Sequence, residues 1–85
     1  MKTIPPAPKV WKRVDGTTVS CTESVRVLTE NWEEAAESLS EFYEDAVLLG
    51  VGKAEFKQAL KSLIDQLECG WEEKTAPVES LPKEK

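Results

Sequence analysis

The sequence contains no histidine and only two cysteines, Cys21 and Cys69, among its 85 residues. Histidine is the commonest general base near neutral pH, so the chain lacks the usual starting point for acid–base catalysis. It also lacks a glycine-rich phosphate loop and the signature of a nucleophilic serine or cysteine. Two distant thiols without histidine do not make a tetrahedral zinc site. We therefore expect no enzyme, no metal and no cofactor.

The chain also lacks long apolar runs. A helix that spans a bilayer needs ~20 consecutive apolar residues, and no stretch approaches this length. The opening MKTIPPAP has no apolar core of the kind that marks a secretion signal. We expect a cytoplasmic protein with no membrane partner, in which both cysteines stay reduced.

Basic residues are few where acidic residues are dense. The net charge is −5, and residues 22–49 carry one arginine against eight acidic side chains. Residues 1–21 are basic, with four lysines or arginines against one aspartate. Nucleic-acid binding depends mainly on neutralising phosphates with clustered basic residues, so we expect no nucleic-acid partner.

The strongest pattern in the sequence is an apolar stripe between Val25 and Leu49. Its members recur at steps of three and four residues, the spacing of a helix that buries one seam. They are Val25, Leu28, Trp32, Ala35, Leu39, Phe42, Ala46 and Leu49. Ser20 and Glu23 fit a capping box at its start, and Asn31 and Glu34 fit a second one that would break the helix. Because the seam continues through Trp32, we favour one helix over about residues 22–49.

A second, shorter helix is predicted over about residues 53–69. Gly50 is the expected left-handed residue that ends the first helix, and the short connection after it requires antiparallel neighbours. Gly70 would end the second helix, with Trp71 as its apolar capping contact. The apolar face of this helix comprises Phe56, Ala59, Leu60, Leu63, Ile64 and Leu67. The predicted fold is mainly α, an antiparallel helical hairpin with arms of unequal length.

The segments outside the helices are short. Residues 1–9 contain three prolines and are predicted to form a flexible arm. Asp15-Gly16 is a turn signal, either in a small two-residue β-hairpin that pairs Lys12 with Val19 or in a turn without strands. Residues 72–85 have the composition of a disordered tail, which leaves 10–71 as a single small helical domain.

The run WKRVDGTTVSC at residues 11–21, followed by a helix that ends EDAVLLG at Gly50, resembles a group of short bacterial proteins of unknown function. The resemblance covers about residues 10–67. It implies no activity, cofactor or partner.

The unequal arms leave part of the stripe without a partner. The second helix reaches back only to about residue 34 or 35, so Val25, Leu28 and part of Trp32 extend beyond it. Either the N-terminal segment folds over them through Trp11 and its neighbours, or a second molecule covers them. Since a two-helix hairpin buries little apolar surface, we favour a homodimer. The same geometry separates Cys21 from Cys69 by ~20 Å along the helix axis, too far for a disulfide.

Glutamates border the stripe along one side of the first helix. They form either a solvated face or a docking surface for a basic partner, and the nearest basic groups belong to Lys9, Lys12 and Arg13. We expect a non-enzymatic protein–protein interaction or accessory module. Its candidate interface is Val25, Leu28, Trp32, Trp11, Glu30, Glu34, Glu37 and Glu41. The alternative is a thiol-based redox sensor or small enzyme centred on Cys21, because a helix N-terminus lowers the pKa of a thiol.

Overall fold

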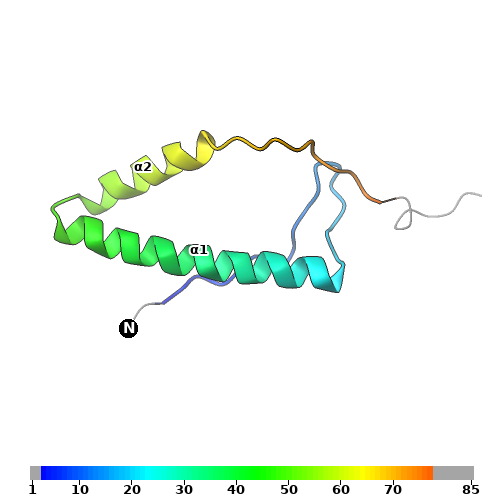
Figure 1. The fold of residues 1–85 in the computed structure, drawn as a ribbon, viewed down its shortest axis with the longest axis horizontal. Coiled ribbons are helices and arrows are strands. Elements are labelled where there is room, and N and C mark those ends of the chain that lie inside the picture. Colours follow the sequence, from blue (N-terminus) through cyan, green and yellow to red (C-terminus); the bar gives the residue numbers. More distant parts are fainter. Residues whose placement is uncertain (1–2, 78–85) are drawn as a thin grey trace, which may run out of the picture.

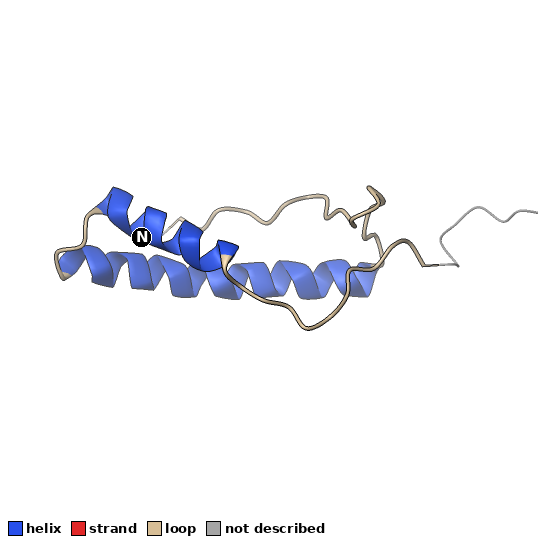
Figure 2. Ribbon diagram, turned by 90° about the horizontal axis from the view of Figure 1, so that it is seen from above, coloured by secondary structure: helices blue, strands red, loops and turns tan. Residues whose placement is uncertain are grey.

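The protein is a helical hairpin of two unequal arms (Figure 1). In the computed structural model, which describes residues 3–77, α1 spans Thr22–Leu48 and α2 spans Lys53–Asp65. Within these residues no strand is present beyond one isolated antiparallel bridge. The predicted mainly α, antiparallel hairpin is confirmed, and Figure 2 shows the long and short arms from a second direction.

Helix α1 is continuous over 27 residues, so the capping signal at Asn31 does not interrupt it. Its N-cap is Cys21, which makes no side-chain capping hydrogen bond. The predicted capping box needs Ser20 at that position, and Glu23 instead bonds to the guanidinium of Arg26. Arg26 also donates to Glu30 at 2.9 Å. One arginine thus links two carboxylates along the first turns of the helix.

The turn between the helices is a Schellman motif. The N–H of Val51 donates to the carbonyl of Ala46 at 2.8 Å, and the N–H of Gly50 donates to Val47 at 3.1 Å. Gly50 has φ +106°, as expected for the left-handed residue of this cap. The cap satisfies carbonyls at the end of α1 and reverses the chain within four residues.

Contact between the helices is confined to the region near this turn. Phe56 of α2 stacks on Tyr43 and meets Phe42 edge-on, both with ring centroids 4.9 Å apart. Within residues 3–77, only Ala46 and Phe56 are buried. The hydrophobic core is therefore a small cluster at one end of the hairpin.

The prediction that the second helix continues to residue 69 is wrong, because α2 ends at Asp65. A short helix depends on tertiary packing. Leu63 and Ile64 in its distal half, and Leu67 beyond its end, are all more than half exposed. The turn that would carry residues 66–69 has nothing to pack against. Trp71 is 85% exposed and does not make the predicted capping contact.

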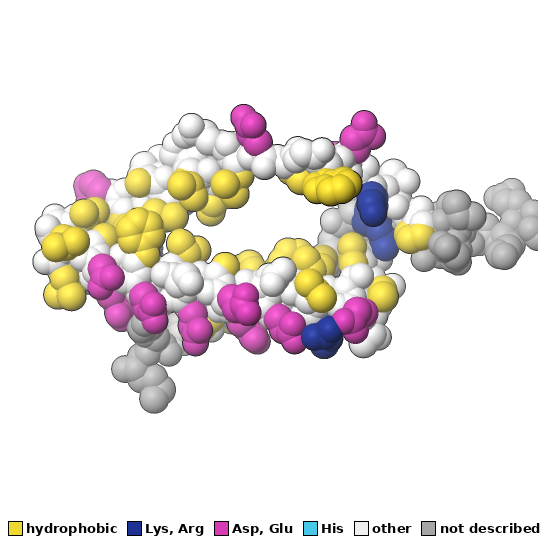
Figure 3. All heavy atoms as spheres, viewed as in Figure 1, with side chains coloured by type: hydrophobic (Ala, Val, Ile, Leu, Met, Phe, Trp, Pro, Cys, Tyr) yellow, Lys and Arg dark blue, Asp and Glu magenta, His cyan; other side chains and the backbone are white. Residues whose placement is uncertain are grey.

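The helices diverge away from the turn, and the chain after α2 returns toward the N-terminal segment (Figure 1). There the N–H of Ala76 donates to a carboxylate oxygen of Asp15 at 3.0 Å. The space-filling view shows an opening bounded by the two helices and this returning segment, with hydrophobic side chains along both edges (Figure 3).

The turn around Asp15 differs in register from the predicted two-residue hairpin. Lys12 lies opposite Thr18, one residue away from the predicted partner Val19. Gly16 donates to the carbonyl of Arg13 at 2.9 Å and has φ +87°, and the N–H of Arg13 donates to Thr17 at 2.7 Å. These bonds define a three-residue loop in which Gly16 takes the left-handed position of a bulge. The extra loop residue shifts the pairing.

Candidate functional site

The N-terminal segment covers the first part of the apolar stripe. Trp11 meets Trp32 edge-on, with ring centroids 6.2 Å apart. The indole N–H of Trp32 also donates to the carbonyl of Pro5 at 2.8 Å. Val25 and Leu28, in the first turns of α1, are partly buried. Of the two alternatives for this part of the stripe, cover by the N-terminal segment is the arrangement found.

A second exposed apolar surface lies on the side of α2 that carries Phe56. We call it the interhelical face and define it by Phe42 on α1 with Leu60, Leu63, Ile64 and Leu67 on α2 and its continuation. Leu63 is 55% exposed and Leu67 is 69% exposed. Sequence reasoning missed this face because it assumed that α2 packs on α1 along its whole length. The apolar side chains were visible in the sequence, but no local signal indicates that the helices diverge.

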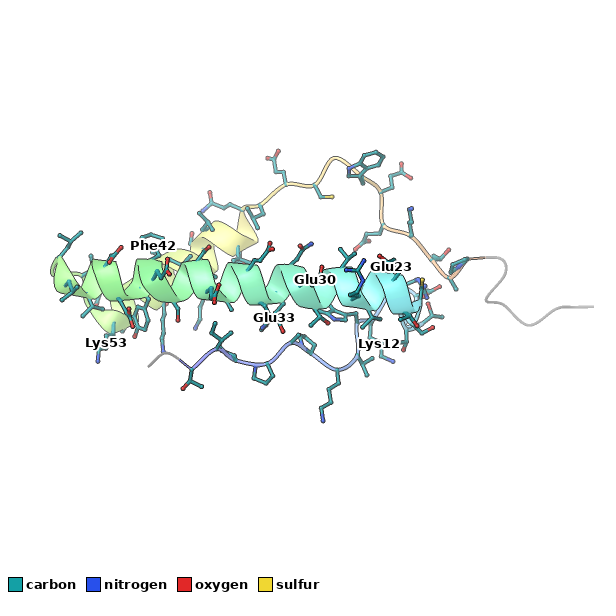
Figure 4. The ribbon with its side chains drawn as sticks, turned by 60° about the horizontal axis from the view of Figure 1, so that its bottom comes forward. Lys12, Glu23, Glu30, Glu33, Phe42 and Lys53 are labelled. Carbon is teal, nitrogen blue, oxygen red and sulfur yellow. The ribbon has the colours of Figure 1, made fainter. Side chains whose placement is uncertain are left out.

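Residues 3–9, which we call the proline arm, lie along α1 (Figure 4). On one side of the arm is a hollow of about 500 Å³, lined by its residues 4–7 and by four glutamates of α1. These are Glu30, Glu33, Glu34 and Glu37. On the other side is an apolar crevice of about 330 Å³ between Pro5, Trp32 and the aromatic pair Tyr43 and Phe56.

The candidate glutamates Glu30, Glu34, Glu37 and Glu41 are all exposed on α1. Two of the three basic residues expected to meet them, Lys12 and Arg13, are engaged elsewhere. Arg13 donates to the hydroxyl of Thr17 at 3.1 Å and to the carbonyl of Thr18 at 2.9 Å. Lys12 lies 3.5 Å from the carbonyl of Gly16. The acidic side of α1 therefore faces the prolines of the arm, while Arg13 and Lys12 stabilise their own turn.

Cys21 combines exposure with a helix N-terminus. The backbone N–H and the hydroxyl of Ser24, together with the N–H of Glu23, lie close enough to the sulfur to lower the pKa of the thiol below its usual value. The negative charge of Glu23 opposes this effect. Cys69 is also a free, exposed thiol, on the segment after α2.

Asp15 also has a shifted pKa. Its carboxylate accepts hydrogen bonds from the hydroxyl of Thr17 at 2.6 Å, from the N–H of Thr17 at 3.0 Å and from the N–H of Ala76. These bonds favour the charged form and lower the pKa to about 2. The same carboxylate thus closes the N-terminal turn and ties the C-terminal segment to it.

Residues 3–77 contain no cluster of three or more side chains suited to hold a metal ion. The same residues include no helix with the length and apolar character needed to cross a bilayer. The chain matches no family model, no curated protein and no solved structure. The features that can carry a function are the apolar surfaces, the acidic hollow and the thiol of Cys21.

Proposed function

We propose that this chain is a non-enzymatic interaction module that forms a homodimer through its interhelical face. The observation that carries the proposal is the opening between α1 and α2, which has hydrophobic side chains on both edges (Figure 3). A helix normally buries one apolar stripe, whereas Leu63 and Ile64 in the distal half of α2 are more than half exposed. The cytoplasmic location stays a prediction from the sequence.

The exposed area supports this proposal. The chain exposes 7636 Å², whereas a compact folded chain of 9.5 kDa exposes about 5,000 Å². The extended segments outside the helices account for part of the excess. Obligate homodimers bury about 2,000 Å² or more in total, about 1,000 Å² from each chain, so the exposed surface is large enough to supply such an interface.

A two-fold axis suits the shape of the opening. Two hairpins placed face to face would bring four helices together and bury the interhelical face of each copy against the other. Lys61 follows the same side of α2 as Lys57, whose ammonium lies 5.7 Å from the ring centroid of Tyr43. Charges that flank an apolar seam select the partner and its orientation, and these two lysines border the proposed interface.

The test compares two leucine variants by light scattering on a sizing column. Leu63→Lys places a charge in the interhelical face, and we expect it to convert a dimer into a monomer. Leu48→Lys is the matched control, because Leu48 is 84% exposed at the turn, outside that face. The control should keep the mass of the unmodified chain. Equal masses for both variants and the unmodified chain would contradict the proposed interface.

A second candidate function is thiol chemistry at Cys21, supported by its exposure and by its lowered pKa. A lower pKa gives more thiolate at neutral pH, so Cys21 should react with iodoacetamide faster than Cys69 at pH 7. Mass spectrometry of the alkylated chain measures both rates. Ser24→Ala should slow the alkylation of Cys21 and leave the alkylation rate of Cys69 unchanged. Equal rates for the two thiols would remove the basis for this candidate.

A further inference from the structure

We propose that the surface of α1 beneath the proline arm is a binding site for an extended proline-rich segment of another protein that carries lysine or arginine. The proline arm is then the intramolecular competitor for this site. This inference goes beyond the homodimer because it uses the side of α1 that carries Trp32 and Tyr43, whereas the proposed dimer uses the interhelical face.

The first observation behind this proposal is the contact between Trp32 and Pro5. The indole N–H of Trp32 donates to the carbonyl of Pro5 at 2.8 Å, across 27 positions of sequence. Proline-rich segments expose carbonyls that have no internal hydrogen bond, because the extended polyproline helix makes none. An aromatic donor aimed at such a carbonyl is the contact by which proline-rich ligands are recognised in aromatic grooves.

The second observation is the apolar space beside Pro5. The apolar crevice of about 330 Å³ continues from Pro5 along α1 to Phe56, and its walls include Trp32 and Tyr43. The arm contributes only Pro5 to this crevice. A longer proline-rich segment would add apolar contacts that the arm does not make.

The third observation is the negative charge of the hollow beside the arm. Four glutamates line the hollow on the other side of the arm, and Glu33 lies on the side of α1 that faces it (Figure 4). The arm places Ile4, Pro5, Pro6 and Ala7 in this hollow, none of which is charged. A ligand with a basic side chain at this position would gain an electrostatic attraction that these four residues do not provide.

The proline arm is covalently attached to the chain that carries the site, and this indicates why the ligand comes from another protein rather than from a second copy. A tethered segment acts at an effective concentration of the order of millimolar, so the identical arm of a second copy cannot displace it at ordinary protein concentrations. A segment with additional prolines and a basic residue can compete, because it uses both the crevice and the glutamates.

The experiment is a titration of the full chain with a synthetic peptide of eight prolines followed by two lysines. The indole N–H signals of a ¹⁵N-labelled sample report the binding, and Trp32 is assigned from Trp32→Phe. We expect a saturable shift of the Trp32 signal with a dissociation constant of about 0.1–1 mM. The signal of Trp71, which is 85% exposed, should stay unchanged.

A variant of the full chain tests the competition directly. Replacing Pro5, Pro6 and Pro8 with serine weakens the arm and should strengthen peptide binding by about threefold or more, because a larger fraction of sites is free. Circular dichroism checks that both helices remain. Glu33→Gln with Glu34→Gln should weaken binding of the peptide, while Glu55→Gln on α2 is the control that should not.

Several results would overturn this inference. One is the absence of a saturable Trp32 shift up to about 5 mM peptide in both the unmodified chain and the triple proline variant. Another is an equal affinity for a peptide in which alanine replaces every proline. A chain mass that falls in the triple proline variant would show that the arm of a second copy occupies the site. Leu63→Lys should still bind the peptide, so failure of the homodimer is separable from failure of this site.

Discussion

Asp15 connects the two ends of the described chain through one carboxylate. It accepts hydrogen bonds from Thr17 within its own turn and from the N–H of Ala76, 61 positions later. An exposed carboxylate makes three such bonds only where the turn presents its donors in the correct direction, and the three-residue loop at residues 14–16 provides this geometry. The C-terminal segment is therefore held where the N-terminal turn forms.

This carboxylate predicts an acid-sensitive contact. The pKa of Asp15 is lowered from 3.8 to about 2 in the folded chain. The contact to Ala76 is thus complete above the unfolded pKa, near pH 4, and is lost as the pH falls through about 2. The amide proton shift of Ala76, followed by NMR against pH, should titrate with a midpoint near 2.

Asp15→Asn is the control for this titration, because the amide side chain does not ionise. Its Ala76 signal should show no such step. A midpoint near the ordinary value for an aspartate would contradict the three hydrogen bonds assigned to this carboxylate.

At the scale of elements, local patterns were sufficient to predict which parts of the chain are helical. The three- and four-residue spacing through Trp32 predicted one uninterrupted α1, and Gly50 was identified as the left-handed residue that ends it. These features depend on residues near one another in sequence. The position at which α2 ends does not depend on nearby residues alone. It depends on whether α1 is close enough for Leu63 and Leu67 to pack against it.

The candidate site was predictable only in part for the same reason. Residue type and spacing identified Trp11 and Trp32 as surface or core anchors, but the bond from Trp32 to Pro5 joins positions 27 apart. The turn register depended on a single residue, since Gly16 takes the bulge position and moves Thr18 opposite Lys12. Neither contact has a signal in the local sequence.

The cap between the helices gives a prediction about backbone strain. Gly50 has φ +106°, and a Cβ added there would meet nothing within 4 Å. Gly50→Ala should therefore destabilise the hairpin through backbone strain alone, by about 1–2 kcal/mol. Urea denaturation followed by circular dichroism measures the loss.

Gly70→Ala is the matched control for this substitution. A Cβ at Gly70 also meets nothing within 4 Å, and its φ lies outside the left-handed region. Its stability should stay within about 0.5 kcal/mol of the unmodified chain. Equal effects of the two substitutions would show that the left-handed conformation of Gly50 does not limit the cap.

At the scale of the whole molecule, the fold has a core at one end and an opening in its middle (Figure 3). Only Ala46 and Phe56 are buried among residues 3–77, while the interhelical face lies along the edges of the opening (Figure 3). A core of this size offsets little of the conformational entropy lost on folding. The proposed homodimer would add to this core, because a second copy of the chain can cover the interhelical face without any further component.

The most direct test is the solution mass of the unmodified full chain, measured by light scattering over a concentration series from about 1 to 500 μM. The proposal predicts a mass near twice 9.5 kDa at the upper end, with helical circular dichroism that falls as dilution releases monomer. A mass of one chain at every concentration, with undiminished helicity, would contradict it. That result would mean that the hairpin is stable with its interhelical face open to solvent.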